Sequence, residues 1–497
     1  MLRTDAAEIA RLTGGALIGG ASGAETVTGS ARIDSRAVEA GDLFAAFDGE
    51  HVDGHRFVGA AREAGAALCL VSREVDVPAV LVDDVEAALS ALAAAQLAAA
   101  RTLHPQLQVI AVTGSAGKTG TKDLIGQLLA PLGPTVAPPG SPNNELGLPL
   151  TVLSLDESTR FLVLEMGARG IGHIAHLTAI APPDISLVLN VGTAHLGEFG
   201  SVEAIAQAKG EIIEALGSEG RAVLAAEDSR VAQMASRSAA PVLTWGLEQG
   251  DLQAHDIDLD ELARPTFTLV LTREVTRADG TVIAAGSAPV ALRTTGEHQV
   301  HTALASAGAA LLAGADLSAV ATGLSTAEAV SAQRMEMRRA GDVLVVNDAY
   351  NANPDSMRLA LRTLAHLGRG RRTFAVLGEM LELGEDAVRL HDEIGRLAVR
   401  LNVTRLIVVG PGAAPIHQGA CLEGSFGGES TYVGTLDEAL AVLEREVRGG
   451  DVVLLKSSRD SGLRTLAPRI LAHLQAEPSG HAPQALGTTP GQGDTPA

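Results

Sequence analysis

The stretch AVTGSAGKTGTKD, residues 111–123, limits the fold of this 497-residue chain more than any other segment. It follows a mostly apolar run, 107–110, so a glycine-rich turn lies where a buried strand passes into a helix that we expect to start near Lys118. Such a turn presents backbone N–H groups at the positive end of a helix, which favours a bound phosphate. Only two residues separate Gly114 from Gly117, whereas the common phosphate loop has four at this point. The stretch therefore predicts an α/β domain with a phosphate site at the edge of its sheet.

Apolar segments suited to buried parallel strands recur along the chain. FLVLE (161–165) and ISLVLN (185–190) are dominated by apolar residues, as in strands that are covered on both faces. The segment 265–294 contains two apolar runs around an Ala-Asp-Gly turn, which indicates an antiparallel hairpin at the edge of the sheet. A second alternation follows residue 315, with strands at DVLVVND, FAVLG, LIVVG and VVLLK and helices from Asp355, near 386–401, near 437–447 and at the end. This pattern predicts a second doubly wound α/β unit.

The length and these patterns divide the chain. At about 150 residues per domain, the chain is long enough for three domains. We expect a small N-terminal α/β domain at 1–106, a central domain with a parallel sheet at 107–315, and a C-terminal Rossmann-like domain at 316–476. The remaining segment, 477–497, is rich in Pro, Gly and polar residues and is predicted to be disordered.

Composition excludes several classes of partner. The formal net charge of −21 argues against nucleic acid, because phosphate neutralisation needs clustered Lys and Arg. Cys69 and Cys421 lack the spacing of metal ligands and indicate a reducing compartment. The N-terminus has no apolar signal segment, and the alanine-rich helix expected at Val85–His104 is uncharged only over 87–100, too short a span to cross a bilayer. We therefore expect a soluble cytoplasmic protein without membrane insertion.

Four motifs resemble those of the Mur ligases, the ATP-dependent enzymes that add amino acids to the peptidoglycan precursor. They are TGSAGKT at 113–119, SPNNELGLPLTVL at 141–153, NDAYNANPDSM at 347–357 and AVLGEMLELG at 375–384. The short glycine spacing is normal in this family, and the other three motifs are similar to its D-alanyl-D-alanine-adding branch. The resemblance spans about residues 33–464. It implies the three-domain Mur ligase architecture, with a P-loop-type ATPase domain in the centre.

The resemblance also implies an activity. The expected reaction is ATP-dependent ligation of D-alanyl-D-alanine to UDP-N-acetylmuramoyl-tripeptide through an acyl phosphate, with ATP and Mg²⁺ as cofactors. UDP-N-acetylmuramoyl-tripeptide and D-alanyl-D-alanine are the expected partners. The N-terminal domain is expected to bind the UDP-precursor, and the chain is expected to be a monomer. Alternatives are another ATP-dependent acid–amine ligase, such as a different Mur-type enzyme or a folylpolyglutamate synthase, and an inactive Mur-like scaffold. A P-loop motor is disfavoured by the glycine spacing.

The phosphate loop and two strand ends supply candidate catalytic residues. Lys118 would place a point charge on the outer phosphates, and the Thr119 hydroxyl would face Mg²⁺. Glu165 and His195 follow two buried strands at the same edge of the sheet and resemble the family's Mg²⁺ ligands. The predicted catalytic residues are Lys118, His195 and Lys209.

Lys209 is a candidate because of the resemblance alone. A plain lysine, with a pKa of about 10.4, would be cationic and would repel a metal ion. In this family the matching lysine is carbamylated by CO₂ and becomes a carboxylate-like ligand, which makes Lys209 the fourth predicted metal ligand. The alternative is a solvated helix lysine in an acidic neighbourhood that includes Glu211 and Glu214.

Further residues are assigned by resemblance to nucleotide and substrate contacts. Asp348 is expected at the ribose and Arg334 at the phosphates. The complete ATP-binding set is Gly114, Ser115, Ala116, Gly117, Lys118, Thr119, Gly120, Thr302, Arg334, Asp348 and Asn351. The predicted substrate-binding residues are Ser35 and Arg36 for UDP, Asn143 and Asn144 for the muramoyl-peptide, Asn353 and Ser356, and Lys456 and Arg459 for the peptide carboxylate.

The sequence departs from the family pattern at a few positions. Gly120 stands where a second Thr or Ser is usual, and Gln333 where Gly is frequent. Gln299 and Thr302 replace asparagines expected near the adenine, and KSSR replaces KGSR at 456–459. None of these changes removes a charge or a metal ligand. Because ATP contacts are expected on two domains, we also expect catalysis to require domain closure.

Overall fold

The computed structural model describes residues 1–49, 52–193, 196–425 and 428–476. His195 and the tail predicted at 477–497 therefore lie outside the described residues. The chain forms two compact units, which are described separately. The first consists of Met1–Met335, Asn353–Thr363 and Met380–Leu390, and the second of Glu336–Ala352, Leu364–Glu379 and the described residues from His391 onward.

The N-terminal part of the first unit is built on a five-stranded sheet. Its strands, in sheet order, are β2 (Ala16–Ile18), β7 (Ala79–Leu81), β6 (Leu68–Val71), β5 (Leu43–Ala45) and β4 (Ala31–Arg32), and every pair except β2–β7 is parallel. Helix α1 (Ala6–Thr13) packs on α3 (Val85–Leu103), and α2 (Val58–Ala64) packs on β6, where Cys69 is fully buried. The alanine-rich segment thus forms α3 in a packed layer. No helix in the described part of the chain combines the length and apolarity needed to span a membrane.

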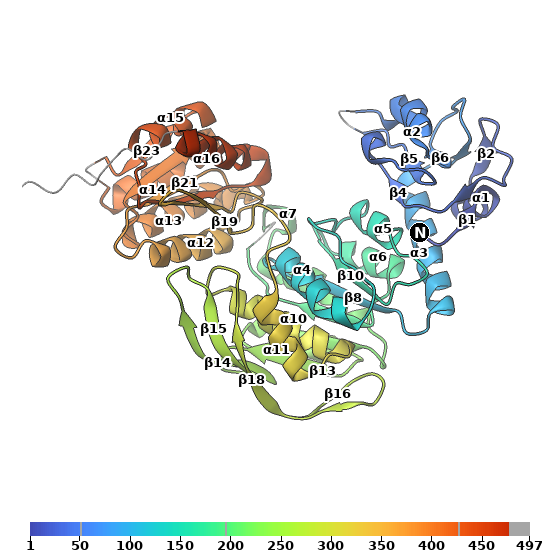
Figure 1. The fold of residues 1–497 in the computed structure, drawn as a ribbon, viewed down its shortest axis with the longest axis horizontal. Coiled ribbons are helices and arrows are strands. Elements are labelled where there is room, and N and C mark those ends of the chain that lie inside the picture. Colours follow the sequence, from blue (N-terminus) through green and yellow to red (C-terminus); the bar gives the residue numbers. More distant parts are fainter. Residues whose placement is uncertain (50–51, 194–195, 426–427, 477–497) are drawn as a thin grey trace, which may run out of the picture. The chain divides into compact units, whose positions relative to one another are not determined.

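A nine-stranded sheet forms the centre of the first unit (Figure 1). From β9 to β14 the strands are parallel, and β15 and β18 complete the sheet as antiparallel neighbours. In sheet order they are β18 (Gly286–Ala291), β15 (Pro265–Leu271), β14 (Leu252–Leu259), β13 (Val242–Gly246), β12 (Arg221–Ala225), β11 (Ile185–Val188), β8 (Gln108–Thr113), β10 (Phe161–Glu165) and β9 (Thr135–Val136). The predicted parallel strands and the predicted hairpin at the sheet edge are all present.

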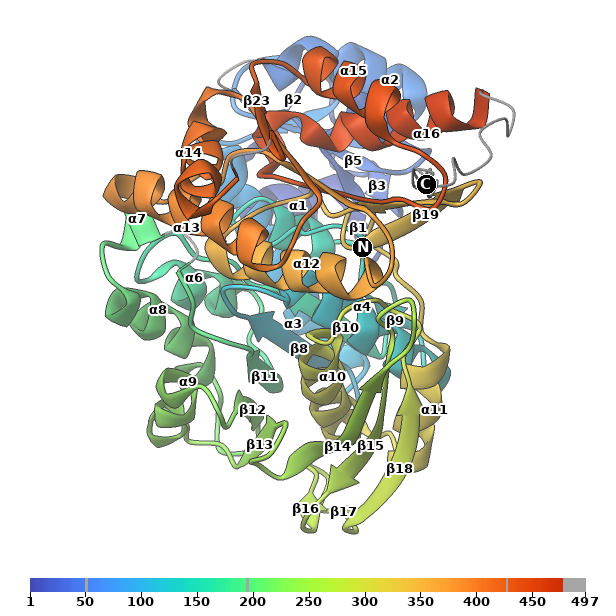
Figure 2. The ribbon, with the colours of Figure 1, turned by 90° about the vertical axis from the view of Figure 1, so that its left-hand side faces the viewer.

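Two layers of helices cover this sheet because its strands are apolar on both faces. Helices α4 (Lys118–Leu129) and α10 (Gln299–Ala313) pack on each other in one layer, and α5 (Gly147–Val152), α6 (His173–Ile180) and α8 (Val202–Glu214) belong to the other. Both α10 and α8 contact β11, and Figure 2 shows the sheet between the two layers. Helix α11 (Leu317–Thr326) packs on α4, α10 and β18, so it joins this unit although it follows the boundary predicted at 315.

The second unit contains a six-stranded sheet in the order β19-β20-β24-β21-β22-β23. Strand β19 (Glu336–Ala340) is antiparallel to β20 (Val343–Asn347), while β24 (Val452–Lys456), β21 (Thr373–Leu377), β22 (Arg405–Val409) and β23 (Ser430–Val433) are parallel to it. The helices of this part of the chain are α12 (Pro354–Leu367), α13 (Ala387–Arg400), α14 (Ala414–Glu423), α15 (Leu436–Glu446) and α16 (Leu466–Ala476). The predicted α/β fold class, with two doubly wound sheets, is confirmed.

Three elements of the second unit, β19, α14 and β23, were not predicted. Helix α14 contains Pro415 and Gly419, which lower helix propensity, and β23 has only four residues between polar segments. Both α14 and β23 pack at the edge of the sheet beside β22, which shows that tertiary contacts outweigh their weak local signals.

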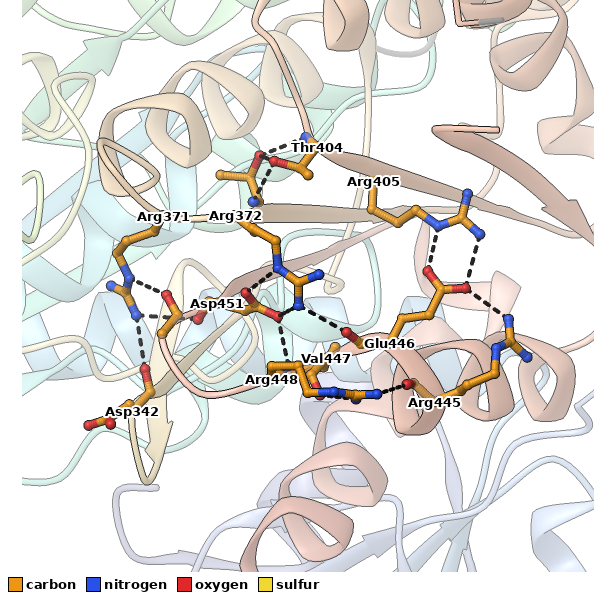
Figure 3. Close-up of polar contacts among 12 residues, drawn as sticks. Asp342, Arg371, Arg372, Thr404, Arg405, Arg445, Glu446, Val447, Arg448 and Asp451 are labelled. Carbon is orange, nitrogen blue, oxygen red and sulfur yellow. Dashed lines mark hydrogen bonds and ion pairs between the residues drawn. The ribbon is translucent and has the colours of Figure 1, made fainter. Parts of the chain in front are cut away.

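Charged side chains join the amino ends of the strands in the second unit (Figure 3). Asp451, 2% exposed and directly before β24, accepts hydrogen bonds from Arg372 Nε at 2.9 Å and Nη2 at 2.6 Å, and from the Arg448 N–H at 2.7 Å. Arg405 Nε pairs with Glu446 Oε2 at 2.7 Å. These ion pairs link the amino ends of the strands. The predicted functional residues lie at the opposite, carboxyl edge of the sheet, after β20 and at the end of β24.

Candidate active site

Three neighbouring parallel strands of the first unit end at one edge of the sheet. Strand β8 lies between β10 and β11, and the chain leaves β8 toward β9 on one side but returns on the other side with β11. Ligands of doubly wound sheets bind where the strand order reverses in this way, at the carboxyl ends of the strands. The glycine-rich loop follows β8, Glu165 ends β10, and Asn190 follows β11.

The glycine-rich loop has the backbone geometry of an anion site. Gly117 has φ 85°, a left-handed conformation that glycine adopts without strain, and α4 begins at the next residue. A Cβ at Gly114 would lie 2.9 Å from the Leu189 Cβ, so the loop also needs glycine for space. No described side chain caps the N-terminus of α4, and its first turn carries no acidic residue. The positive end of α4 is therefore suited to a phosphate.

Asn190 holds the first half of this loop. Its Oδ1 accepts hydrogen bonds from the N–H groups of Ser115 and Ala116, each at 2.9 Å, and its Nδ2 donates to the Ala116 carbonyl at 3.1 Å. The Ser115 hydroxyl accepts from the Gly192 N–H at 2.9 Å. Sequence reasoning missed Asn190, although an amide at the end of an otherwise apolar strand was a usable signal.

Glu165 is the centre of a buried polar group. The residue is 2% exposed, and its Oε2 accepts a hydrogen bond from the Thr119 hydroxyl at 2.7 Å. Its Oε1 accepts from the Ser141 hydroxyl and from Asn143 Nδ2, both at 2.6 Å. A carboxylate and a hydroxyl that meet beside a phosphate loop are the ligand types that Mg²⁺ prefers. The structure thus brings together three predicted residues, Thr119, Glu165 and Asn143, and adds Ser141.

Two lysines lie at this edge, the half-buried Lys118 and the buried Lys209, and the charge of Lys118 acts on Lys209. Lys118 Nζ donates to the Gly114 carbonyl at 2.8 Å, and its pKa is lowered by burial, an effect that the nearby charge of Glu165 opposes. Lys209, 3% exposed on α8, has a pKa well below its ordinary value because of burial and, next, the charge of Lys118. Both effects favour the neutral form of this amine over the charged one.

The alternative interpretation of Lys209 as a solvated lysine in an acidic neighbourhood is wrong. Lys209 is buried, and the two acids are engaged elsewhere. Glu211 accepts hydrogen bonds from the Gly172 and Ala175 N–H groups at 2.6 and 2.9 Å, and Glu214 pairs with Arg237 at 2.8 Å.

The rest of the predicted metal set is only partly visible. His195 lies outside the described residues. Within the described residues, no group of three or more His, Cys, Asp or Glu side chains is arranged to hold a metal ion. A cation at Glu165 would therefore depend on ligands of other kinds, such as the Thr119 hydroxyl, a modified lysine, and phosphate or water oxygens.

The structure shows the surroundings of two positions that depart from the family pattern, Gly120 and Gln333. A Cβ on Gly120, in the first turn of α4, would lie 3.8 Å from the Thr302 methyl, so these positions face each other between α4 and α10. Gln333 has φ 61° and Met335 φ 51°. Arg334 is thus held between two left-handed residues, which explains why glycine suits position 333.

In the second unit, Lys456 and Asp348 form a buried ion pair. Lys456 ends β24, is 2% exposed, and its Nζ lies 2.6 Å from Asp348 Oδ2. The same Nζ donates to the Asn351 carbonyl at 3.1 Å. Because its ammonium already has these acceptors, the geometry favours a role for Lys456 in holding Asp348 over direct binding of a substrate carboxylate.

The other predicted contacts occupy turns and helix starts. Asn353 and Ser356 cap α12 reciprocally: the Asn353 N–H donates to Ser356 Oγ at 3.0 Å, and the Ser356 N–H donates to Asn353 Oδ1 at 2.8 Å. Asn144 Oδ1 accepts from the Gly147 N–H at 2.9 Å. Ser35 and Arg36 follow β4 in a short 3₁₀ turn, where the exposed Arg36 pairs with Asp34, and Arg459 is exposed after β24.

The chain is similar to known proteins both domain by domain and over its length. The Mur ligase family catalytic domain matches residues 30–111, the Mur ligase middle domain matches 112–310, and the glutamate ligase domain of Mur ligases matches 333–459. The UDP-N-acetylmuramoyl-tripeptide–D-alanyl-D-alanine ligase of Mycobacterium tuberculosis is 47% identical over 95% of this chain and 98% of its own length. The Escherichia coli enzyme of the same name is 31% identical over 90% of this chain and 94% of its own.

Solved structures agree with these matches. A crystal structure of MurF from Acinetobacter baumannii has a TM-score of 0.82 at 30% identity and covers 95% of this chain and 99% of that one. MurF ligase from Thermotoga maritima in complex with ADP has a TM-score of 0.74 at 29% identity and covers 90% of this chain and 98% of that one.

Fold and site together are those of an enzyme with a candidate phosphate site at a glycine-rich loop and a second doubly wound unit. With the domain matches and relatives above, the chain belongs to the Mur ligase family. It is an ATP-dependent ligase, and the family resemblance of its four motifs is confirmed.

Proposed function

We propose that this chain joins D-alanyl-D-alanine to UDP-N-acetylmuramoyl-tripeptide with ATP as the energy source, forming the UDP-MurNAc-pentapeptide. The names of the relatives that match nearly the whole chain support this choice among Mur-type ligases. The observation that carries it is the contact of the Thr119 hydroxyl with Glu165 at 2.7 Å beside the phosphate loop. The alternative of an inactive scaffold would not require this buried polar pair.

The proposed chemistry activates a carboxylate that has no leaving group of its own. An oxygen of the tripeptide carboxylate attacks the γ-phosphorus of ATP, ADP leaves, and an acyl phosphate forms. The amine of D-alanyl-D-alanine, after losing a proton, attacks the acyl carbon, and phosphate leaves from the tetrahedral intermediate. Repulsion between the carboxylate and the triphosphate reaches about 4 kcal/mol per pair of unit charges at 4 Å. Lys118 and the N–H groups at the start of α4 are the proposed sources of compensating charge.

Thr119, Glu165, His195 and carbamylated Lys209 are the proposed holders of Mg²⁺. When bound, the ion would neutralise negative charge on the phosphates and orient the reacting oxygens. The residues that the structure describes fit such an ion, since Glu165 offers a buried carboxyl group in contact with a hydroxyl. Lys118, His195 and Lys209 remain the proposed catalytic residues.

The burial of Lys209 supports its carbamylation. CO₂ forms a carbamate only with a neutral amine, which loses one proton in the step. At an ordinary pKa of about 10.4 only about 0.04% of lysine is neutral at pH 7, whereas burial lowers the pKa of Lys209 well below its ordinary value. We expect Lys209→Ala to be inactive and to regain activity with added short-chain carboxylates. Full activity of this variant without such a rescue contradicts the assignment.

The remaining contacts are proposed from the family motifs. ATP would meet the loop residues 114–120, Thr302, Arg334, Asp348 and Asn351. The precursor and dipeptide would meet Ser35, Arg36, Asn143, Asn144, Asn353, Ser356 and Arg459, with Lys456 holding Asp348.

We further propose that the chain acts in the cytoplasm as a monomer, with domains at 1–106, 107–315 and 316–476, except that α11 (Leu317–Thr326) packs with the central domain. The chemistry supports the compartment because ATP and nucleotide-linked precursors are cytoplasmic. Light scattering of the purified chain, with and without substrates, would test the oligomeric state.

The activity is tested by phosphate release. We expect release only when ATP, UDP-MurNAc-tripeptide and D-alanyl-D-alanine are all present, and none from the matched variant Lys118→Met. Release with UDP-MurNAc-dipeptide and a free diamino acid would assign the chain to another Mur-type activity. Absence of release with every acceptor would favour the scaffold.

A further inference from the structure

Lysine is rare in this chain. Of 38 basic residues only four are lysines, at positions 118, 122, 209 and 456, and all the others are arginines. Three of the four have a place in the site described above. The fourth, Lys122, is not assigned by the family motifs, although it lies on α4 one turn after Thr119 and is only 1% exposed. Position 122 therefore carries a compact ammonium group in a chain whose basic residues are almost all arginines.

The ammonium of Lys122 binds the backbone of another segment. Its Nζ donates to the carbonyls of Pro138 and Gly140, the latter at 3.0 Å, and lies 2.7 Å from Asp123 Oδ1. The N–H of Gly140 donates to the Ser331 hydroxyl at 3.1 Å. Gly140 is therefore held at both of its polar backbone groups.

The same segment continues directly to Glu165. Ser141 follows Gly140, and Ser141 and Asn143 both donate to Glu165 Oε1 at 2.6 Å. The Gly167 N–H also donates to the Asn143 carbonyl at 2.7 Å. The other carboxylate oxygen of Glu165 binds Thr119, which is on α4 with Lys122. A closed ring of contacts therefore joins α4, the segment 138–143 and Glu165.

We infer that Lys122 is a positioning residue for the ligation reaction. It fixes the segment 138–143 against the helix that starts at the phosphate loop, and so sets where Ser141 and Asn143 meet Glu165. Asn143 is a proposed contact of the muramoyl-peptide, so this inference rests on the proposed function. Loss of Lys122 should disturb the alignment of the peptide carboxylate with the γ-phosphate more than the binding of nucleotide, because misplacement by about 1 Å can cost 100-fold in rate.

The test compares Lys122→Met with wild type in the phosphate-release assay. We expect kcat/KM for UDP-MurNAc-tripeptide to fall at least tenfold, while the Kd for ADP changes less than threefold. Lys122→Arg should recover little, because its larger guanidinium does not fit a site that is 1% exposed. Since Lys122→Met leaves Asp123 without its partner, the double variant with Asp123→Asn is measured in parallel, and it should show the same split.

Coupling to Asn143 separates positioning from general destabilisation. Asn143→Ala combined with Lys122→Met should be no worse than the more damaging single variant, because both disturb one arrangement. Arg277→Met is the matched control, since Arg277 also binds backbone carbonyls, those of Leu311 and Ala315, away from the site. Arg277→Met should lower stability without changing kcat/KM for UDP-MurNAc-tripeptide or the Kd for ADP.

Two results would overturn the inference. One is an active Lys122→Met variant with wild-type kcat/KM for the tripeptide; the other is a loss of ADP affinity as large as the loss of kcat/KM. If wild type itself releases no phosphate with these substrates, the proposed function fails, and the inference that rests on it fails with it; the two results above contradict the inference alone.

Discussion

At the scale of single residues, a buried lysine lowers stability unless its charge is satisfied. Lys209 is 3% exposed and its pKa is well below the ordinary 10.5 because of burial. Below pH 10.5 the unfolded chain binds a proton that the folded chain resists, so stability is lost as the pH falls from 10.5 toward the folded pKa.

We therefore predict that Lys209→Met is inactive but more stable than wild type. In CO₂-free buffer its free energy of unfolding should be higher by about 1 kcal/mol near pH 7, and the gain should shrink toward pH 10. Urea unfolding at the two pH values measures both effects. A variant less stable than wild type at neutral pH would show that the amine has a favourable partner in the fold.

The residue scale also shows what sequence could and could not predict. The loop, Glu165 and Thr119 followed from strand ends and glycine spacing, because parallel strands deliver such groups to one edge. The bond between Lys122 and Gly140 could not be predicted, since no rule of local spacing links α4 to a segment 18 residues away. Lys456 was assigned to the substrate because it ends a predicted strand, and its contact with Asp348, 108 residues away in the sequence, could not be predicted.

At the scale of elements, the phosphate loop depends on the end of the neighbouring strand. Asn190, two residues after β11, binds both N–H groups of Ser115 and Ala116 through one oxygen. We predict that Asn190→Ala weakens ADP binding about tenfold, because the loop loses the acceptor that holds its shape. Isothermal titration measures the affinity.

Asn190→Asp is the matched variant. It keeps the acceptor oxygen but adds a negative charge near the phosphates, so it should bind ADP more weakly than Asn190→Ala at low salt. Tighter binding by Asn190→Ala would mean that the side chain competes with the nucleotide rather than preparing the loop.

We expect the ion pairs at the amino edge of the six-stranded sheet to affect stability and not catalysis. Asp451→Ala removes three hydrogen bonds around a buried carboxylate, and we predict a loss of about 3 kcal/mol in the free energy of unfolding of the second unit. Urea titration measures it, with Asp437→Ala as control. Asp437 is 83% exposed and pairs with Arg469 on the surface, so its removal should cost less than about 1 kcal/mol. Equal losses for the two variants would contradict this account.

The helices and strands that could be predicted are those with a clear pattern of apolar residues. The buried strands β8, β10, β20, β21, β22 and β24 follow from runs of aliphatic residues. Helix α14 and strand β23 were missed because Pro, Gly and polar residues weaken the local signal, and only packing beside β22 stabilises them.

At the scale of the whole molecule, the proposed ATP contacts are divided between the two units. Lys118 belongs to the first and Asp348 to the second. We predict that the radius of gyration falls when a non-hydrolysable ATP analogue, UDP-MurNAc-tripeptide and D-alanyl-D-alanine are added together, because catalysis needs both groups at one nucleotide. Solution scattering measures this, with each ligand alone as control. An unchanged radius with all three would argue against closure as a step of the reaction.

The small number of lysines also determines how this protein reacts with reagents that modify amines. Lys122, Lys209 and Lys456 are at most 3% exposed, and the terminal amine of Met1 is bonded to the Gly29 carbonyl at 2.6 Å. Succinimidyl dyes and aldehyde fixatives should therefore leave its exterior almost unmarked. A nucleotide that carries an aldehyde on its last phosphate would, in contrast, be delivered by the loop to Lys118 and label that one position.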